Sequence, residues 1–143
     1  MRNIRQMMTD SVESCSLLDN MYEVALKMKE YNIGAIPIVD GEELVGMITD
    51  RDIVVRGVAE KKPGSSKVED IMSEHLITVT PETSSEDATR IMAEHQIRRL
   101  PVVEGSKLVG MVSLGDIALD SQLDNHAEEA LTEISEQGGQ HFQ

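Results

Sequence analysis

Two short segments place a hydroxyl and a carboxylate at a spacing that could hold a nucleotide. They cover residues 46–52 and 110–116, and in each a β-rich run ends in Thr49 or Ser113, with an aspartate three residues later. Ligands commonly bind beyond the carboxyl ends of strands in sheets covered by helices. A hydroxyl and a helix N-terminus there can hold phosphate, and a carboxylate one turn in can accept both ribose hydroxyls. The pattern is typical of a nucleotide site.

The same spacing also forms a helix capping box. The Thr49 hydroxyl would accept the N–H of Asp52 while the Asp52 carboxylate reaches back to the first residue, and Ser113 with Asp116 would do the same. Spacing alone favours this cap, which needs no ligand. The nucleotide and the cap therefore remain alternatives for both segments.

Three arginines lie near these two segments. Arg51 lies between Thr49 and Asp52, and Arg98 with Arg99 directly precedes the strand expected from Leu100. Guanidinium groups match the geometry of phosphate. For any single arginine a local ion pair with one of the many acids is the better explanation. The joint placement of the three arginines supports a phosphate clamp about as well as it supports local ion pairs.

The chain is an internal duplication with a constant offset of 64 residues. The matching positions are 33–41 with 97–105, 44–49 with 108–113, Asp52 with Asp116, Met8 with Met72, and Met28 with Met92. Since the offset never changes, no insertion or deletion separates the copies.

Each copy predicts the same order of elements, β-α-β-β-α. Capping pairs Asn20–Glu23 and Ser84–Asp87, followed by apolar residues at helical spacing, predict helices over about 20–31 and 84–95. Turn signals at 40–41 and 104–105 predict hairpins. The hairpin strands are expected at 35–39 with 44–48 and at 99–103 with 108–112. Extended stretches are expected before the first helices, at 12–15 and 77–79, and second helices begin at about Asp50 and Leu114.

One such copy would leave much of its sheet uncovered, so the two are expected to form one α/β fold of the α+β type. We expect them to pack sheet to sheet about a pseudo-two-fold axis. The predicted organisation is a first repeat at 2–60, a linker at 61–67, a second repeat at 68–122 and an acidic tail at 123–143. The tail begins as a short helical stretch and is expected to fray.

Composition excludes several classes of function. A net charge of −13 argues against nucleic-acid binding, and no apolar run approaches the roughly 20 residues that a membrane span needs. A single cysteine, Cys15, and a start without a secretory signal pattern predict a cytoplasmic protein. The four histidines share no metal-ligand spacing, and no residue pattern suggests a catalytic nucleophile or acid–base pair. We therefore expect no metal site and no enzyme.

The two copies resemble a tandem pair of CBS domains, named after cystathionine β-synthase and also called a Bateman module. The resemblance covers about residues 2–122 and is most specific at 33–40 and 44–53 with their copies. It implies a regulatory sensor that binds AMP, ADP or ATP, or sometimes S-adenosylmethionine, in clefts between the repeats. It also implies a homodimer that reports ligand state to an unknown protein partner, with no cofactor required.

The resemblance also implies a role for individual residues of this sequence. Asp52 and Asp116 would bind ribose, while Thr49, Ser113, Arg51, Arg98 and Arg99 would bind phosphate. The base would lie against Ile33, Ile36, Thr78, Val79, Thr80, Ile97, Leu100 and Pro101, chiefly against their backbone.

The two sites are expected to differ. The second repeat has Arg98 and Arg99 where the first has Gly34 and Ala35, so the second is expected to be the better nucleotide site. The alternative is a ligand-free structural or protein-interaction dimer, in which both segments are helix caps. A sensor of S-adenosylmethionine is a further alternative.

Overall fold

The computed structural model describes residues 2–120 and Ile134, and the expected acidic tail otherwise lies outside the described residues. The chain divides into two compact units. We call residues 13–76 the first-repeat unit, and residues 2–12 and 77–120 with Ile134 the second-repeat unit. Each unit contains one of the two hairpins that the repeats predict.

In the first-repeat unit, strand β1 (Cys15–Ser16) pairs in parallel with β2 (Ala35–Asp40), and β2 pairs antiparallel with β3 (Glu43–Thr49). Helix α1 (Met21–Tyr31) begins at the capping box of Asn20 and Glu23. After β3 come the short helix α2 (Asp50–Asp52), a π-helical turn η2 (Ile53–Gly57), and the 3-10 turns η3 (Val58–Glu60) and η4 (Val68–Asp70).

The second-repeat unit repeats this order. It contains the 3-10 turn η1 (Ile4–Gln6), helix α3 (Ser85–His95), the antiparallel pair β4 (Arg99–Glu104) and β5 (Lys107–Ser113), and helix α4 (Leu114–Asp120). Val79 forms a parallel bridge to Val102, at the place where the first unit has β1 beside β2. The cap of α3 is the Ser84 hydroxyl, which accepts the N–H of Asp87.

Details of the two hairpins match at the offset of 64 residues. Gly41 and Gly105 turn them with φ of 66° and 65°, a region that glycine adopts without strain. Register shifts fall between Ile38 and Val39, and again between Val102 and Val103. The predicted α/β fold with a duplicated set of elements is confirmed.

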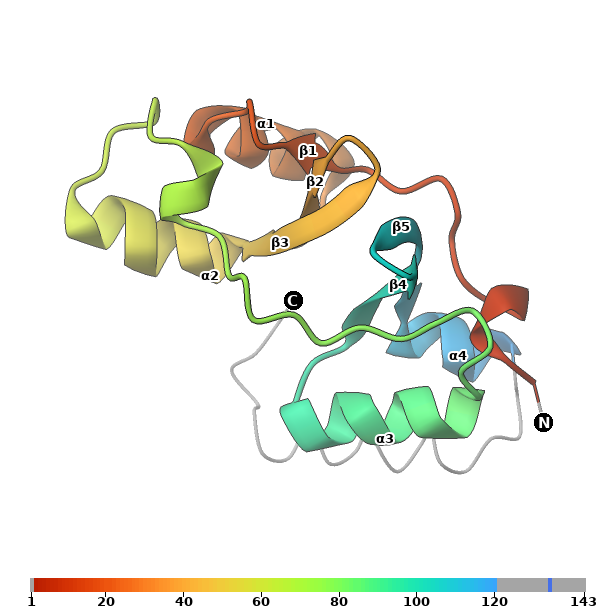
Figure 1. Cartoon of the computed structure of the whole chain (residues 1–143). Coiled ribbons are helices and arrows are strands. Elements are labelled where there is room, and N and C mark those ends of the chain that lie inside the picture. Colours follow the sequence, from red (N-terminus) through yellow and green to blue (C-terminus); the bar gives the residue numbers. More distant parts are fainter. Residues whose placement is uncertain (1, 121–133, 135–143) are drawn as a thin grey trace. The chain divides into compact units, whose positions relative to one another are not determined.

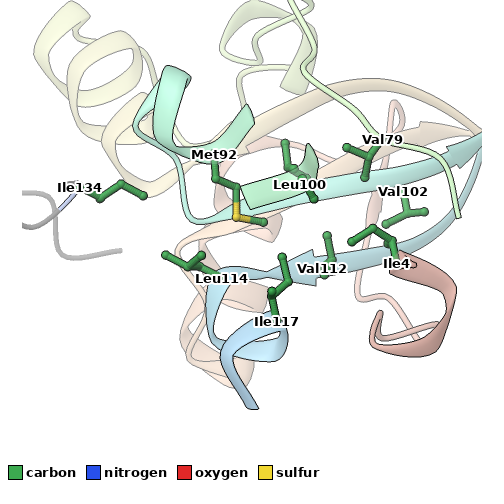
Figure 2. Packing of buried hydrophobic residues seen from close by; sticks show 10 residues of the cluster. Ile4, Val79, Met92, Leu100, Val102, Val112, Leu114, Ile117 and Ile134 are labelled. Atoms are coloured by element: carbon green, nitrogen blue, oxygen red, sulfur yellow. The ribbon is translucent and has the colours of Figure 1, made fainter. Parts of the chain in front are cut away.

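Each unit has its own apolar core. In the second-repeat unit the core side chains come from η1, α3, β4, β5 and α4 (Figure 2). Ile4, Leu100 and Ile117 there are fully buried, and Ile134 is 2 % exposed. In the first-repeat unit Val24, Ile36 and Ile48 are among the fully buried residues.

A short segment at the start of each repeat packs in the unit of the other repeat. We call residues 2–9 the lead segment and residues 66–73 the middle segment. The lead segment begins the first repeat in the sequence, yet it lies beside α3 and α4 of the second-repeat unit (Figure 1). The middle segment spans the start of the second repeat and lies in the first-repeat unit.

The two segments make equivalent contacts. The carbonyl of Arg2 accepts the N–H of Ser85 at 3.0 Å, and the carbonyl of Ser66 accepts that of Met21 at 2.9 Å. Thr9 pairs with Met111 as Ser73 pairs with Met47. Their buried side chains, Ile4 and Val68, are both fully enclosed.

Candidate functional site

The strand-to-helix turns of both repeats are complete capping boxes. The Thr49 hydroxyl accepts the N–H of Asp52 at 3.1 Å, and Asp52 Oδ2 accepts the N–H of Thr49 at 2.9 Å. Ser113 and Asp116 make the same two bonds at 3.0 and 2.9 Å. Each cap is therefore complete within the chain itself. They use only one oxygen of each carboxylate, and a carboxylate has further lone pairs for other donors.

Backbone hydrogen bonds hold each turn against the loop that precedes the hairpin. The N–H of Asp50 donates to the carbonyl of Gly34 at 2.9 Å, and the N–H of Leu114 donates to the carbonyl of Arg98 at 2.8 Å. Arg99 also faces Ser113 across the β4–β5 pair. Within the second-repeat unit, Arg98, Arg99, Ser113 and Asp116 therefore belong to one neighbourhood.

Within residues 2–120, the three arginines do not form the local ion pairs that were the simpler explanation. Among the ion pairs between described residues, none involves Arg51, Arg98 or Arg99. Arg51 is exposed, whereas the Nε of Arg98 is buried and has no hydrogen-bond partner in the described part of the chain. A buried donor without a partner is rare, and it is commonly satisfied by water or a bound group. Arg98 is thus the distinctive side chain of this neighbourhood.

The residues expected to line the base lie in both units. Ile33 and Ile36 belong to the first-repeat unit, and the others belong to the second-repeat unit: Thr78, Val79, Thr80, Ile97, Leu100 and Pro101. Ile36 and Leu100 are fully buried core residues, and Val79 is 4 % exposed. What such residues could offer a ligand is their backbone, while Thr80 is exposed.

The structure also bears on the environment of Cys15, on metal binding and on membrane-spanning helices. Cys15 is 3 % exposed, and burial, together with the nearby Asp19 carboxylate, raises the pKa of its thiol to about 11. Among the described residues, no group of three or more His, Cys, Asp or Glu side chains is placed to hold a metal ion. The helices of residues 2–120 include none that is long and apolar enough to cross a membrane.

Ion pairs of the lead segment were not expected from the sequence. Arg2 pairs with Asp120 at 2.5 and 3.1 Å, and Arg5 pairs with Glu82 at 2.7 Å and Glu104 at 3.3 Å. The signal was available in the duplication itself. At the equivalent positions of the first-repeat unit Ser66, Glu69, Leu18 and Arg56 stand in place of Arg2, Arg5, Glu82 and Asp120, so these ion pairs depart from the repeat pattern.

Comparison with known proteins identifies the repeats. The model of the CBS domain matches residues 4–57 and again residues 68–120. The chain belongs to the CBS-domain family. A relative in Bacillus subtilis, the uncharacterized protein YlbB, is 49 % identical over 138 residues, which cover 95 % of this chain and 93 % of YlbB.

Solved structures of CBS-domain proteins have the same fold. Hypoxic response protein I with two coordinated zinc ions aligns with a TM-score of 0.77 and 34 % identity, over 85 % of this chain and 100 % of that chain. CBSX2 in complex with AMP aligns with a TM-score of 0.75 and 25 % identity, over 84 % and 96 % of the two chains. The CBS pair of MJ0100 with 5′-methylthioadenosine and S-adenosyl-L-methionine gives 0.73 and 26 %, over 83 % and 94 %.

Proposed function

We propose that this chain is a regulatory module that binds an adenosine nucleotide and passes its ligand state to a protein partner. The observation that carries the proposal concerns Arg98, whose backbone bonds to the turn that carries Ser113 and Asp116. Its buried Nε has no hydrogen-bond partner among the described residues. A guanidinium that forms no ion pair with the acids of residues 2–120 is suited to an anionic ligand. The complex of CBSX2 with AMP supports the same class of ligand.

In the proposed complex the second repeat is the main site. Asp116 accepts the ribose hydroxyls, while Ser113, Arg98 and Arg99 hold the phosphate. The first repeat offers Asp52, Thr49 and Arg51 for the same roles, but Gly34 stands where the second repeat has Arg98. Phosphorylated ligands should therefore bind the second repeat more tightly. The chain would act by binding rather than catalysis, with no cofactor required.

Exposed apolar side chains on the first repeat support a protein-binding role. Leu18, Tyr22 and Leu26, four residues apart, are 95, 60 and 46 % exposed. Val54 and Val58, on the turns after α2, are 58 and 64 % exposed. We propose that a second copy of the chain or the regulated protein covers such residues, with a cytoplasmic homodimer as the working assembly.

The second candidate function is a ligand-free interaction module. The complete capping boxes favour it, because they explain the Thr-x-x-Asp and Ser-x-x-Asp spacing without a ligand. A sensor of S-adenosylmethionine is the third candidate, and the complex of MJ0100 favours it.

A thermal-shift screen separates these candidates. AMP, ADP, ATP, GTP and S-adenosylmethionine are added to the purified chain, and each stabilising compound is then titrated by calorimetry. A ligand at 100 times its Kd stabilises a fold by about 2.7 kcal/mol, which should raise Tm by about 5–10 °C. A shift with S-adenosylmethionine alone would favour the third candidate. No shift with any compound would favour the interaction module.

Matched variants then locate the site. Asp116→Asn keeps an oxygen that can cap α4, but it loses the negative charge and one acceptor for ribose. We expect it to abolish the nucleotide shift, while Asp52→Asn leaves the larger response intact. The reverse result would move the main site to the first repeat. A nucleotide response that survives both substitutions would show that the assignment of the ribose aspartates is wrong.

A further inference from the structure

We propose that the lead segment, residues 2–9, is the element through which occupancy of the second-repeat site is reported. This inference rests on the proposed nucleotide function. Its starting point is that the lead segment is joined to the second-repeat unit by backbone hydrogen bonds and ion pairs that are not part of the β4–β5 pairing. Three backbone N–H groups of the segment donate to that unit: Ile4 to Thr83, Arg5 to Pro81 and Thr9 to Met111, at 2.8–2.9 Å.

The lead segment contacts both ends of the β5–α4 turn, which carries the residues proposed to bind ribose and phosphate. Thr9 exchanges two backbone hydrogen bonds with Met111, which lies on β5 two residues before Ser113. Arg2 pairs with Asp120, the last residue of α4, whose first turn carries Asp116. A ligand on Ser113 and Asp116 therefore binds an element that the lead segment holds at either side.

Charge ties the lead segment to this unit and not to the other. At the equivalent positions of the first-repeat unit, Ser66 and Arg56 replace Arg2 and Asp120. Glu69 stands in place of Arg5. Leu18 stands in place of Glu82, and Asp40 in place of Glu104. If the middle segment took the place of the lead segment, Glu69 would face two glutamates. The opposite charges therefore give the lead segment a specific place.

Local opening of the lead segment would break exposed ion pairs and withdraw Ile4 from the core. The ion pairs are partly solvent-exposed, with Arg2 at 50 % and Arg5 at 52 % side-chain exposure, and such pairs are individually weak. Ile4 supplies the apolar anchor. Because linkage between two binding events is reciprocal, if docking of the lead segment strengthens ligand binding by some factor, the ligand strengthens docking of the lead segment by the same factor.

The test is hydrogen exchange of the full chain, read by mass spectrometry, with and without saturating AMP. AMP should slow exchange at Ile4, Arg5 and Thr9 by about fivefold or more, as expected for ordinary coupling between two sites. Exchange at Ser73, whose N–H bonds within the first-repeat unit, should change less. Equal protection of the two segments, or none in the lead segment while calorimetry shows AMP bound, would overturn the inference.

A variant pair tests the connection without any ligand. Asp120→Asn removes the charge that pairs with Arg2, so exchange at Ile4 and Arg5 should rise about twofold to fivefold. Arg56→Gln changes the equivalent position of the first repeat and should leave these amides unchanged. Unchanged exchange in Asp120→Asn would overturn this inference but leave the proposed function untouched. If neither AMP, ADP nor ATP binds, the proposed function fails and this inference fails with it.

Discussion

The side chain of Met8 packs onto Gly110, where a Cβ would lie 2.7 Å from the methionine sulfur and 2.9 Å from the carbonyl oxygen of Thr9. Met72 packs onto Gly46 in the same way in the other unit. These two contacts relate methionines that are 64 residues apart to glycines with the same offset. The glycines therefore leave room for a segment that belongs to the other repeat in sequence.

Substituting the two glycines should have unequal effects. Gly110→Ala should lower the free energy of unfolding by about 1–3 kcal/mol, because the methyl group would meet the backbone of Thr9. Gly46→Ala should cost less, since only the flexible Met72 side chain is in the way. Urea unfolding of both variants measures this, and equal losses would contradict the difference in packing.

Replacing a third glycine should stabilise the fold. Gly115 lies in α4, and a Cβ there would make only an ordinary contact with the Ser113 hydroxyl at 3.7 Å. Alanine has the higher helix propensity, so Gly115→Ala should raise stability by about 0.5–1 kcal/mol. Gly105→Ala is the control, because its φ of 65° should make the same change destabilising. A loss of stability in Gly115→Ala would refute the assignment of this residue to a helix.

Ile4 should be worth as much as a residue of the central strands. It is fully buried, so Ile4→Ala should cost about 2–5 kcal/mol in the free energy of unfolding. Leu18→Ala is a control at a side chain that is 95 % exposed, and it should change stability by less than about 0.5 kcal/mol. Chemical denaturation followed by circular dichroism compares the two. If Ile4→Ala proved neutral, the lead segment would not be docked in solution.

Cys15 should be unreactive at neutral pH. Burial and the Asp19 carboxylate raise the pKa of its thiol from 9.0 to about 11 in the folded chain, so the thiolate is disfavoured there. Its contribution to stability is present below pH 9 and is lost as the pH rises toward 11, because the unfolded chain releases the proton first. A chromogenic disulfide reagent should react slowly at pH 8 until denaturant is added, and Cys15→Ser should remove the reaction. Rapid labelling of the native chain would contradict this environment.

Local patterns were enough to predict the elements of each repeat. Asn20 and Glu23 cap α1 as expected, and the turns at Gly41 and Gly105 close the two hairpins. The helices from Asp50 and Leu114 also begin where the sequence placed them. These features depend on residues close together in the chain, where capping, turn chemistry and periodicity act.

We call the packing of the lead and middle segments in the unit of the other repeat the segment exchange. Such local patterns could not predict it, because it depends on residues far apart in sequence. The Arg2–Asp120 pair joins residues separated by 118 positions, and no periodic pattern in the sequence predicts it. The sequence likewise did not reveal whether the arginines pair with nearby acids. That depends on where acids such as Glu82 are already engaged, which only the folded arrangement of the lead segment determines.

The order in which the chain leaves the ribosome gives the segment exchange a consequence for folding. Residues 13–76 form a contiguous stretch that contains all of the first-repeat unit described above, so that unit can complete itself early in translation. The lead segment is synthesised before it, but β5 and α4 emerge only with residues 107–120. Ile4 is thus among the first core residues to be made and among the last to be buried, and a nascent-chain chaperone would find it exposed throughout that interval.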